Sequence, residues 1–300
     1  MPNNTTLTRI EKVLDYIHEH LDEPICVAAL AEKSCWSRWQ FQRVFGNATG
    51  LTVAQYVREL RLSQAAELLL GNQDRHLDIA LACGFESDIS FSRAFKQMFR
   101  CSPREYRQRG KRIGLRTPLK HCTPKRTWST PTAFTQIRIE NRAAFSITGC
   151  CDWIYGPFSE QPNFIERVPQ VWRALEQERM SSPISPKDSP MGVIDNRKQN
   201  EHPERLLYWA GYPAYGTYPS SCGSYPAPKV LNIPEQEYAV IPVHGMVSAL
   251  ESAVEWFIGH WLPESNYSGA SGFELEVYSP NYNPISNDSY MEYWLPIEPR

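Results

Sequence analysis

The sequence predicts a two-domain protein in which an all-helical domain precedes an α+β domain. The chain of 300 residues is long for one hydrophobic core and comfortable for two. Apolar residues follow a helical period through roughly the first 110 residues, and they alternate as in strands farther along. Charge divides the chain in the same way. Residues 1–126 hold 20 Lys and Arg against 13 Asp and Glu, whereas residues 127–300 hold 11 against 20.

Helix signals follow one another through the first part of the chain. Thr8, Ser37 and Ser102 each stand three positions before a Glu or Gln, which is the capping-box pattern of a helix start. Gly50 is placed to end a helix. We expect helices over residues 8–21, 27–33, 37–50, 53–70, 77–82 and 87–99, and a last one that begins at 102.

One supersecondary pattern occurs twice among these helices. A short Ala/Leu-rich helix, a tight turn and a longer Ser-capped helix with two buried Phe residues appear at 27–47 and again at 77–99. A short helix, a turn and a longer helix form a helix-turn-helix. The sequence therefore predicts an all-α domain over residues 1–112 with two helix-turn-helix units, tied together by the long helix between them.

The longer helix of each unit directs a group of polar side chains away from the core. Arginine can pair with guanine and glutamine with adenine, while apolar atoms meet thymine methyl groups in the major groove. The second helix is poorer in such base readers. The candidate DNA contacts are Arg38, Trp39, Gln42 and Arg43 in the first helix, and Ser90, Ser92, Arg93 and Lys96 in the second.

The runs SRWQFQRVFGNATG, YVRELRLSQAAELL and IALACGFESDISFSRAFKQMFRCSPREYR strongly resemble the AraC-type DNA-binding domain of the MarA, SoxS and Rob subgroup, over residues 8–109. The resemblance implies two recognition helices in successive major-groove turns, roughly 34 Å apart. It implies Trp39, Gln42 and Arg43 as contacts of the first helix. The chain departs from the pattern at Cys35, where relatives often have Gly. It also departs at Asp88, because Asp88 and the next residue stand where close relatives have two Gln. Two alternatives remain for the second helix: it reads bases, or it binds only phosphates.

The composition changes after the last of these helices. Residues 113–132 are rich in Thr, Pro and basic residues and are predicted to form a linker. An α+β domain of two similar halves is expected over residues 133–300. We expect strands at 134–139, 143–148, 206–212, 238–243, 273–278 and 290–296, helices at 169–179 and 249–261, and a polar loop at 181–203.

Two expected strands of this domain place carboxylates beside aromatic rings. Alternation puts Glu276 and Tyr278 on one face of the first strand, and Glu292 and Trp294 on one face of the second. If these faces coincide, the carboxylates and rings suit an organic cation. Without a cation, burial would raise the pKa of the glutamate. Trp209 is a further ligand candidate, with a place in the core as its alternative.

The runs YAVIPVHGMVSALESAVEWFIGHWLPESNYSGASGFELEVYSP and YMEYWLPIE resemble the GyrI-like small-molecule-binding domain, over residues 134–300. The resemblance implies two pseudo-repeated α+β halves with a cleft between them for amphipathic, often cationic compounds. By position, it implies Glu276 and Glu292 as the carboxylates of that cleft. A helix-turn-helix half followed by a GyrI-like half is the order found in Rob-like regulators.

The sequence lacks the residue patterns typical of metal sites, phosphate-binding loops, hydrolase nucleophiles and membrane spans. No C-x-x-C pair or finger-like His/Cys spacing predicts a metal, and no phosphate loop or nucleophile elbow predicts a cofactor or an enzyme. No apolar run approaches about 18 residues, and the first residues are polar, so we expect no membrane partner and a cytoplasmic location.

The function expected from the sequence is a DNA-binding transcription regulator. Its C-terminal domain would sense a small amphipathic or cationic effector. Two alternatives concern that domain. It could hydrolyse a small molecule with Glu276 and Tyr278 or Tyr293, or it could dock a protein such as RNA polymerase without any ligand.

Overall fold

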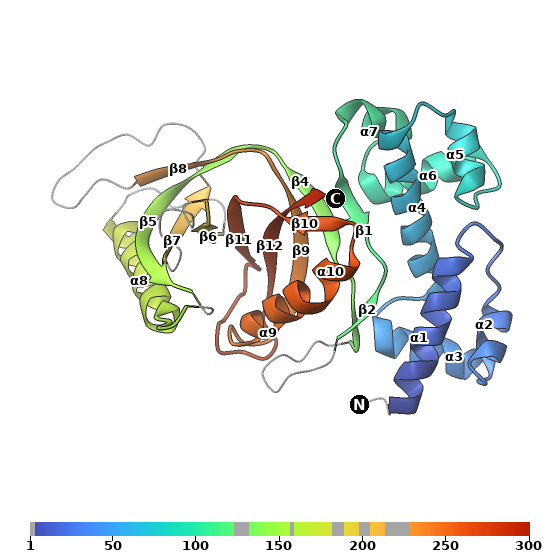
Figure 1. Cartoon of the computed structure of the whole chain (residues 1–300), viewed down its shortest axis with the longest axis horizontal. Helices are drawn as coiled ribbons and strands as arrows, with labels where there is room; N and C mark the ends of the chain where they lie inside the picture. Colours follow the sequence, from blue (N-terminus) through green and yellow to red (C-terminus); the bar gives the residue numbers. More distant parts are fainter. Residues whose placement is uncertain (1–3, 123–131, 157–158, 182–188, 198–204, 214–228) are drawn as a thin grey trace. The chain divides into compact units, whose positions relative to one another are not determined.

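The computed structural model describes residues 4–122, 132–156, 159–181, 189–197, 205–213 and 229–300 (Figure 1). The chain divides into two compact units, Met1–Asn141 (unit 1) and Arg142–Arg300 (unit 2). Within these described ranges, no helix combines the length and the apolar character that crossing a membrane requires.

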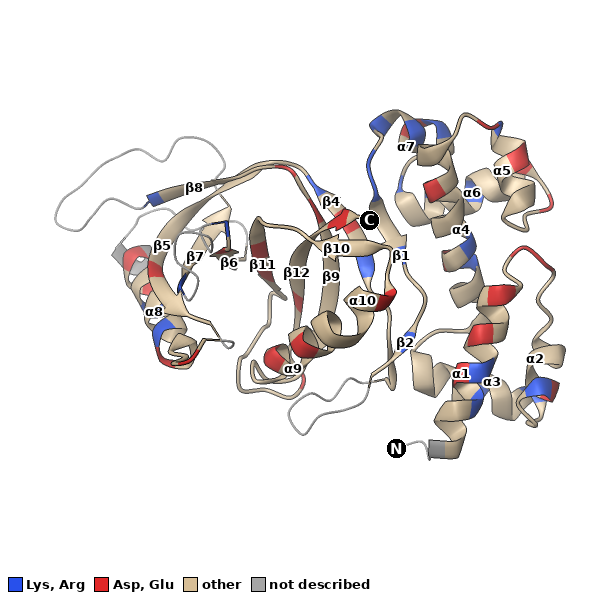
Figure 2. Ribbon diagram, in the orientation of Figure 1, with Lys and Arg blue, Asp and Glu red and all other residues tan. Residues whose placement is uncertain are grey.

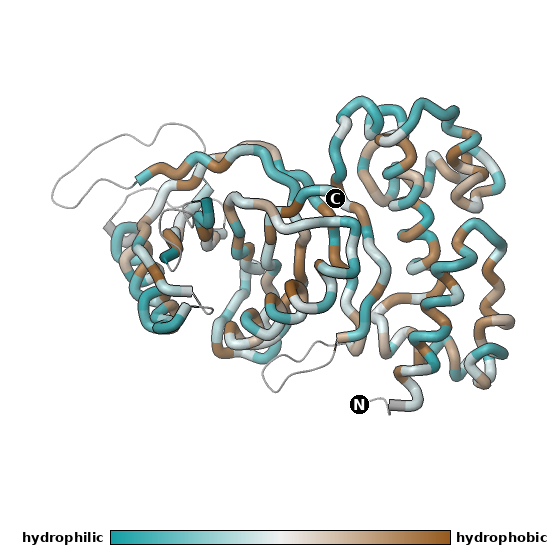
Figure 3. Tube along the Cα trace, viewed as in Figure 1, coloured by the Kyte–Doolittle hydropathy of each residue, from teal (hydrophilic) through white to brown (hydrophobic). Residues whose placement is uncertain are grey.

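Unit 1 begins with the seven expected helices. They are α1 (Asn4–Glu19), α2 (Val27–Lys33), α3 (Arg38–Thr49), α4 (Val53–Gly71), α5 (His76–Ala82), α6 (Asp88–Phe99) and α7 (Pro103–Arg109). Hydrophobic and hydrophilic residues alternate in short segments along them (Figure 3). Ser37 and Ser102 form the predicted capping boxes. Thr8 does not cap a helix, because α1 already begins at Asn4 and Thr8 lies inside it.

Aromatic rings fill the cores of both helix-turn-helix units. In the first, Phe41, Phe45 and Tyr56 are fully buried, with ring centroids about 6 Å apart. In the second, Phe91 and Phe95 pack in the same way, with centroids 5.4 Å apart. The predicted repeat is therefore confirmed at the level of the core, since each unit buries a Phe pair from its longer helix.

Residues 112–122 and 132–135, here called the strap, are packed on these helices rather than free of them. They contain β1 (Ile113–Arg116), β2 (Lys120–His121) and β3 (Phe134–Thr135). β1 pairs with β4 (Arg138–Arg142), and β2 pairs with β3. The segment 113–132 thus has strand structure where a linker was expected, and 123–131 lie outside the described residues. The predicted bounds 1–112 remain a prediction, but unit 1 extends past them to Asn141.

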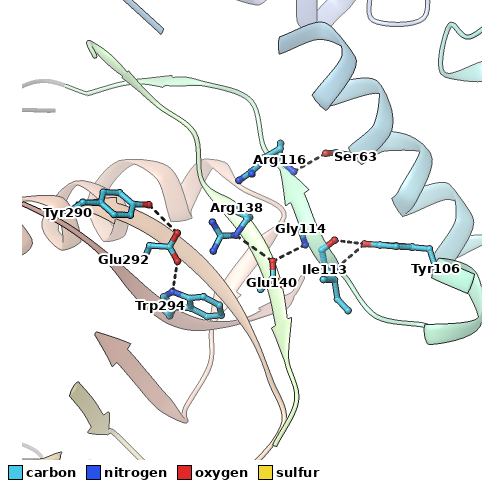
Figure 4. Close-up of polar contacts among 10 residues, drawn as sticks. All are labelled: Ser63, Tyr106, Ile113, Gly114, Arg116, Arg138, Glu140, Tyr290, Glu292 and Trp294. Atoms are coloured by element: carbon cyan, nitrogen blue, oxygen red, sulfur yellow. Dashed lines mark hydrogen bonds and ion pairs between the residues drawn. The ribbon is translucent and has the colours of Figure 1, made fainter. Parts of the chain in front are cut away.

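Hydrogen bonds fasten the strap backbone to the helices of unit 1, and Figure 4 shows those of Ile113 and Arg116. The Tyr106 hydroxyl accepts the Ile113 N–H at 2.9 Å and donates to the Ile113 carbonyl at 3.1 Å. The Arg116 N–H donates to Ser63 Oγ at 2.8 Å, and the Leu119 N–H donates to the Tyr56 hydroxyl at 3.0 Å. Leu119 and Phe134 join the apolar core of the first helix-turn-helix.

Unit 2 is built around an antiparallel sheet of strand order β9-β12-β11-β6-β7-β5-β8, with β10 paired to β12. The strands are β5 (Phe145–Tyr155), β6 (Met191–Asp195), β7 (Arg205–Pro213), β8 (Lys229–Ile233), β9 (Gln236–His244), β10 (Tyr267–Gly269), β11 (Phe273–Tyr278) and β12 (Tyr290–Pro299). The helices are α8 (Phe164–Ser181), α9 (Ala249–Trp256) and α10 (Leu262–Glu264), with a π-helical turn over Phe257–Trp261.

The predicted duplication of unit 2 is confirmed by its topology. Each half runs strand, helix, strand, strand: β5-α8-β6-β7, then β9-α9-β11-β12. The last strand of each half lies between the other two, and β6 and β11 meet at the middle of the sheet. The expected polar loop at 181–203 is corrected, because Met191–Asp195 form the fully buried strand β6.

We predict that Tyr106→Phe destabilises unit 1 by about 1–3 kcal/mol, because the ring would stay buried while both hydrogen bonds to Ile113 are lost. Urea unfolding of the full chain, followed at a probe in unit 1, measures the change. Tyr16→Phe is the control, since it removes a half-buried hydroxyl away from the strap. Equal stability of the two variants would contradict the fastening role of Tyr106.

Candidate nucleic-acid interface and ligand site

The exposed face of α3 carries the predicted first group of DNA contacts. Ser37 caps the helix, and Phe41 and Phe45 anchor its inner side. Arg38, Trp39, Gln42 and Arg43 are all exposed, Trp39 to 66%. The Arg43 guanidinium carbon lies 5.1 Å from the centroid of the Trp39 ring, so the two side chains hold each other beside the helix.

The α6 helix repeats the geometry of α3 with a different exposed surface. Both helices have 12 residues and follow a serine N-cap, Ser37 or Ser87, so the positions of α6 match those of α3 at an offset of 50. Arg93 takes the place of Arg43, but Asp88 takes the place of Arg38. The capped second helix therefore presents fewer groups that read bases.

The four predicted contacts in α6 differ in their surroundings. The Ser90 hydroxyl donates to the Ser87 carbonyl at 2.8 Å within the N-cap, and Ser92 is half-buried. Arg93 and Lys96 are exposed. Ile89, which sequence reasoning did not select, is 66% exposed at the position of Trp39. The signal that could have found it is the offset between the two helices.

A left-handed residue precedes each of these helices. Cys35 has φ +57° and Gly84 has φ +72°, and each lies in the turn of its helix-turn-helix. Glycine adopts this conformation without steric cost, whereas a residue with a Cβ does not. Cys35, which departs from the family pattern, therefore occupies a position that favours glycine for a backbone reason.

The register of β11 and β12 corrects the predicted ligand face. Glu276 lies opposite Tyr293, and Val277 lies opposite Glu292. Residues directly opposite each other share a face of the sheet. Glu276 and Glu292 therefore point to opposite faces, although the alternation within each strand is as expected. Trp294 lies opposite Leu275, on the face of Glu292.

On its own face, Glu276 accepts two tyrosine hydroxyls. Tyr208 and Tyr278 both donate to Oε2, at 2.6 and 2.5 Å, and Trp172 Nε1 donates to the Tyr208 hydroxyl at 2.8 Å. Glu276 is only 7% exposed. Among the described residues, its other oxygen, Oε1, has no hydrogen-bond partner. One oxygen thus fixes the carboxylate, and the second is left for another group.

A glycine makes room for this arrangement. Gly192 of β6 lies opposite Glu276, and a Cβ there would stand 2.3 Å from Glu276 Oε2 and 2.6 Å from the Tyr208 hydroxyl oxygen. Real Cβ atoms do not approach so closely, so only glycine allows Glu276 and Tyr208 to meet over β6.

Glu274, two residues earlier on the same face, has both oxygens engaged. Asn196 Nδ2 donates to Oε1 at 3.0 Å, and the Tyr293 hydroxyl donates to Oε2. Sequence reasoning did not select Glu274, Tyr208 or Trp172 for the site, and it named Tyr293 only for the hydrolase alternative. Strand alternation places Glu274 beside Glu276, but nothing local in the sequence indicates which residues of other elements face it.

This face of the sheet buries two carboxylates, those of Glu274 and Glu276, without a basic side chain bound to either among the described residues. Burial raises the pKa of Glu276, against the hydrogen bonds from Tyr208 and Tyr278, and the nearby Glu274 raises it further. Burial also raises the pKa of Glu274. Within the described part of the chain, no Lys or Arg pairs with either carboxylate. Figure 2 shows further acidic residues on α9.

Aromatic rings border the Glu276 carboxylate. The Trp172 ring meets Tyr278 edge-on at 5.4 Å between centroids, and the Tyr282 ring lies 4.6 Å from Tyr278. Burial raises the pKa of Tyr282 to about 12, and Glu276 contributes to that rise. A carboxylate with one free oxygen thus stands among neutral rings, where a positive charge would be attracted.

The opposite face has the character of a core. The Glu292 carboxylate accepts from Tyr290 at 3.1 Å and from Trp294 Nε1 at 3.0 Å, as Figure 4 shows. Trp294 and Trp209 are buried in the apolar cluster of this face. Of the five predicted ligand residues, the structure therefore brings together Glu276 and Tyr278, and it places the other three elsewhere.

Two family models match the chain. Residues 30–109 match a helix-turn-helix domain, and residues 135–298, more than half of the chain, match the GyrI-like small molecule binding domain. In the described ranges, no group of three or more His, Cys, Asp or Glu residues could hold a metal ion.

Several curated proteins are similar to the N-terminal third of the chain. Regulatory protein SoxS of Salmonella typhimurium is 37% identical over 100 residues, which cover 33% of this chain and 94% of SoxS. Transcriptional regulator Rob of the same organism is 37% identical over 113 residues, 37% of this chain and 39% of Rob. The putative regulator YkgA of Escherichia coli is 42% identical over 100 residues, 33% of this chain and 42% of YkgA. The chain thus spans less than half the length of Rob and YkgA.

Solved structures resemble each unit. The DNA-binding domain of AdpA, in complex with a target DNA, has 31% identity and a TM-score of 0.33 over 34% of this chain and 91% of its own. SAV2435 bound to tetraphenylphosphonium has 13% identity and a TM-score of 0.42 over 55% of this chain and 94% of its own.

The N-terminal domain is assigned by the match over 94% of SoxS and by the match to Rob. The C-terminal domain is assigned by the GyrI-like match over more than half of the chain. The chain belongs to the AraC-type transcription regulators related to SoxS, MarA and Rob, which are not enzymes, and it carries a C-terminal GyrI-like small-molecule-binding domain in a Rob-like architecture.

Proposed function

We propose that the chain binds a specific DNA sequence through α3, with a weaker grip from α6, and that a cationic amphipathic molecule at Glu276 changes its regulatory output in the cytoplasm. The observation that carries the ligand proposal is the buried Glu276 carboxylate, which binds two tyrosine hydroxyls through Oε2, has no basic partner among the described residues and keeps Oε1 free.

The DNA proposal rests on the exposed face of α3. Trp39 and Arg43 stack on each other at the N-terminal half of the helix, where helix-turn-helix proteins contact bases. A ring of this size 66% exposed to water has no role in the core, and in a groove it offers apolar contact to thymine methyl groups. In α6 the position equivalent to Arg38 is Asp88, whose carboxylate would repel DNA phosphates. We therefore expect α6 to bind DNA more weakly than α3.

The choice of a cation rests on desolvation. Burial disfavours the ionised carboxylate, and two hydroxyl donors on Oε2 offset only part of that cost. A cation near Oε1 would offset more of it, and the rings of Trp172, Tyr278 and Tyr282 would contact the apolar part of the same molecule. An anion would meet two buried carboxylates and would be rejected.

The deciding experiment is selection of bound sequences from a random DNA pool by the full chain, with and without tetraphenylphosphonium as the cation. An enriched motif whose recovery changes with the cation would support both halves of the proposal. No enrichment at low salt would overturn sequence-specific binding. Enrichment that ignores the cation, together with no cation binding, would overturn the effector role alone.

For the DNA half, we predict that Arg43→Ala weakens binding to the selected site by about 1–3 kcal/mol and leaves random DNA much less affected. Arg93→Ala, the equivalent change in α6, should weaken both DNAs alike and lower the salt slope by about one unit, because it removes a phosphate contact. Fluorescence anisotropy titrations at several salt concentrations measure both. Equal losses on both DNAs for Arg43→Ala would reassign that contact to phosphate.

For the ligand half, we predict that the chain binds tetraphenylphosphonium but not tetraphenylborate, which has the same shape and the opposite charge. Glu276→Gln should lower the affinity roughly ten- to hundredfold, because the charge is lost and the shape is kept. Glu292→Gln is the matched control and should leave it unchanged, since Glu292 lies on the other face. Calorimetric titration decides, and an equal loss in both variants would contradict the site.

Cation binding should weaken as the pH is lowered. The folded chain holds the proton of Glu276 more tightly than the unfolded chain, because burial raises its pKa above the ordinary 4.5. The contribution of this proton to the stability of the fold is therefore present at acid pH and is lost as the pH rises through the raised pKa. Above that pKa the carboxylate is ionised, and a bound cation can stabilise it instead. Tetraphenylphosphonium titrations at successively lower pH should show falling affinity as Glu276 takes up its proton, and Glu276→Gln should abolish the dependence. A flat profile for the unaltered chain would contradict this assignment.

A further inference from the structure

Arg61, in the middle of α4, joins the two helix-turn-helix units through their backbones. Its Nε donates to the Leu21 carbonyl at 2.7 Å, and its Nη2 donates to the Glu23 carbonyl at 2.6 Å. Both carbonyls belong to the segment that leads from α1 into α2. Its Nη1 donates to the Gly84 carbonyl at 2.9 Å, in the turn between α5 and α6. One guanidinium therefore holds the segment that enters the first helix-turn-helix and the turn of the second.

The chemistry of this contact is directional. A guanidinium is planar and carries five donors in a fixed fork, so three carbonyls bound at once fix its orientation and their own. Burial lowers the pKa of Arg61, but arginine stays protonated in proteins, so all three hydrogen bonds are charge-assisted. Lysine, a flexible point charge, could not span the same three carbonyls.

Gly84 is shaped by the same contact. A Cβ on Gly84 would stand 2.8 Å from Arg61 Cζ and 2.9 Å from Nη2. Glycine is thus required here both by its left-handed φ of +72° and by the approach of the guanidinium. Gly84, whose carbonyl Arg61 binds, lies three residues before Ser87, the N-cap of α6. The orientation of α6 therefore depends directly on this turn.

We propose that Arg61 is the positioning residue that fixes α3 and α6 relative to each other and so sets the spacing of the two DNA segments that the regulator binds. The spacing part rests on the DNA-binding role proposed above, whereas the fixed geometry does not. Two recognition helices can enter successive groove turns only at a defined separation, roughly 34 Å on straight DNA. Without this fork, only α4 and the strap would connect the two helix-turn-helix units, and their relative orientation would be less constrained.

Arg107 offers a matched control. Its Nε donates to the Leu69 carbonyl at 3.2 Å, and its Nη2 donates to the Asp74 carbonyl at 2.7 Å. These bonds have the same chemistry as those of Arg61, but they hold only the C-terminal end of α4 and the residues after it. Arg107→Gln should therefore cost stability without loosening one unit against the other.

The first test measures geometry in the full chain without DNA. Spin labels carried on unnatural amino acids at Asn47 and Gln97, exposed equivalent positions of α3 and α6, report their separation by double electron–electron resonance. We expect one narrow distance for the unaltered chain and for Arg107→Gln, and a broadened distribution for Arg61→Gln. Gly84→Ala adds a methyl group that would clash with the Arg61 guanidinium, and it should shift or broaden the distance. It is the alternative variant if Arg61→Gln does not fold. A distribution in Arg61→Gln as narrow as that of Arg107→Gln, or a Gly84→Ala distribution that is neither shifted nor broadened, would overturn the proposal.

The second test measures spacing on DNA. Hydroxyl-radical footprints on sequences selected by each chain should show one fixed separation between two protected segments for the unaltered chain and for Arg107→Gln. Arg61→Gln should protect segments at several separations and bind the fixed site roughly tenfold more weakly. An unchanged single separation would overturn the spacing role. Failure of the unaltered chain to bind DNA would instead overturn the proposed function, and the spin-label distances would still judge Arg61.

Discussion

The meeting of two tyrosine hydroxyls on one oxygen of Glu276 is the constraint on which the site in unit 2 depends. It requires Tyr278 from the strand of Glu276 itself, Tyr208 from β7 and a glycine at 192 on β6 between them. It also requires Trp172 of α8, which orients the Tyr208 hydroxyl by donating to it. Because these groups come from four elements, the carboxylate is buried and oriented before any ligand arrives, and this reduces the ordering cost of binding.

The duplicated halves of unit 2 contribute unequally to this site. Tyr208 lies opposite Ile194 on β6, as Tyr293 lies opposite Glu276 on β11, so the two tyrosines occupy equivalent positions. Each donates to a glutamate of β11, but β6 supplies only glycine and isoleucine at the corresponding places. The helical unit shows a similar asymmetry between α3 and α6. In both units, duplication supplies the scaffold, and divergence of one copy supplies the chemistry.

The helices of unit 1 were predictable from the sequence because their signals are local, as the capping box at Ser37 illustrates. The faces of single strands were predictable for the same reason. The pairing of faces was not, because register depends on how β11 and β12 meet across the intervening residues 279–289, and a shift of one residue moves every side chain to the other face. β6 was not predicted because it has only five residues, Met191–Asp195, and polar residues on both sides make the whole segment resemble a loop. Arg61 escaped because its partners are backbone carbonyls of distant segments.

A ligand changes regulatory output only if it binds two states of the protein with different affinity. In the proposed function Glu276 would supply such a difference, because burial disfavours its ionised carboxylate and a bound cation would offset that cost. Residues 138–145, where β4 is followed closely by β5, connect unit 2 back along the chain to the strap. The strap is the next part of the chain in that direction, and Tyr106, Ser63 and Tyr56 hold it along the helices. Because unit 1 is fastened in this way and by Arg61, a displacement at the strap would move helices together as a body.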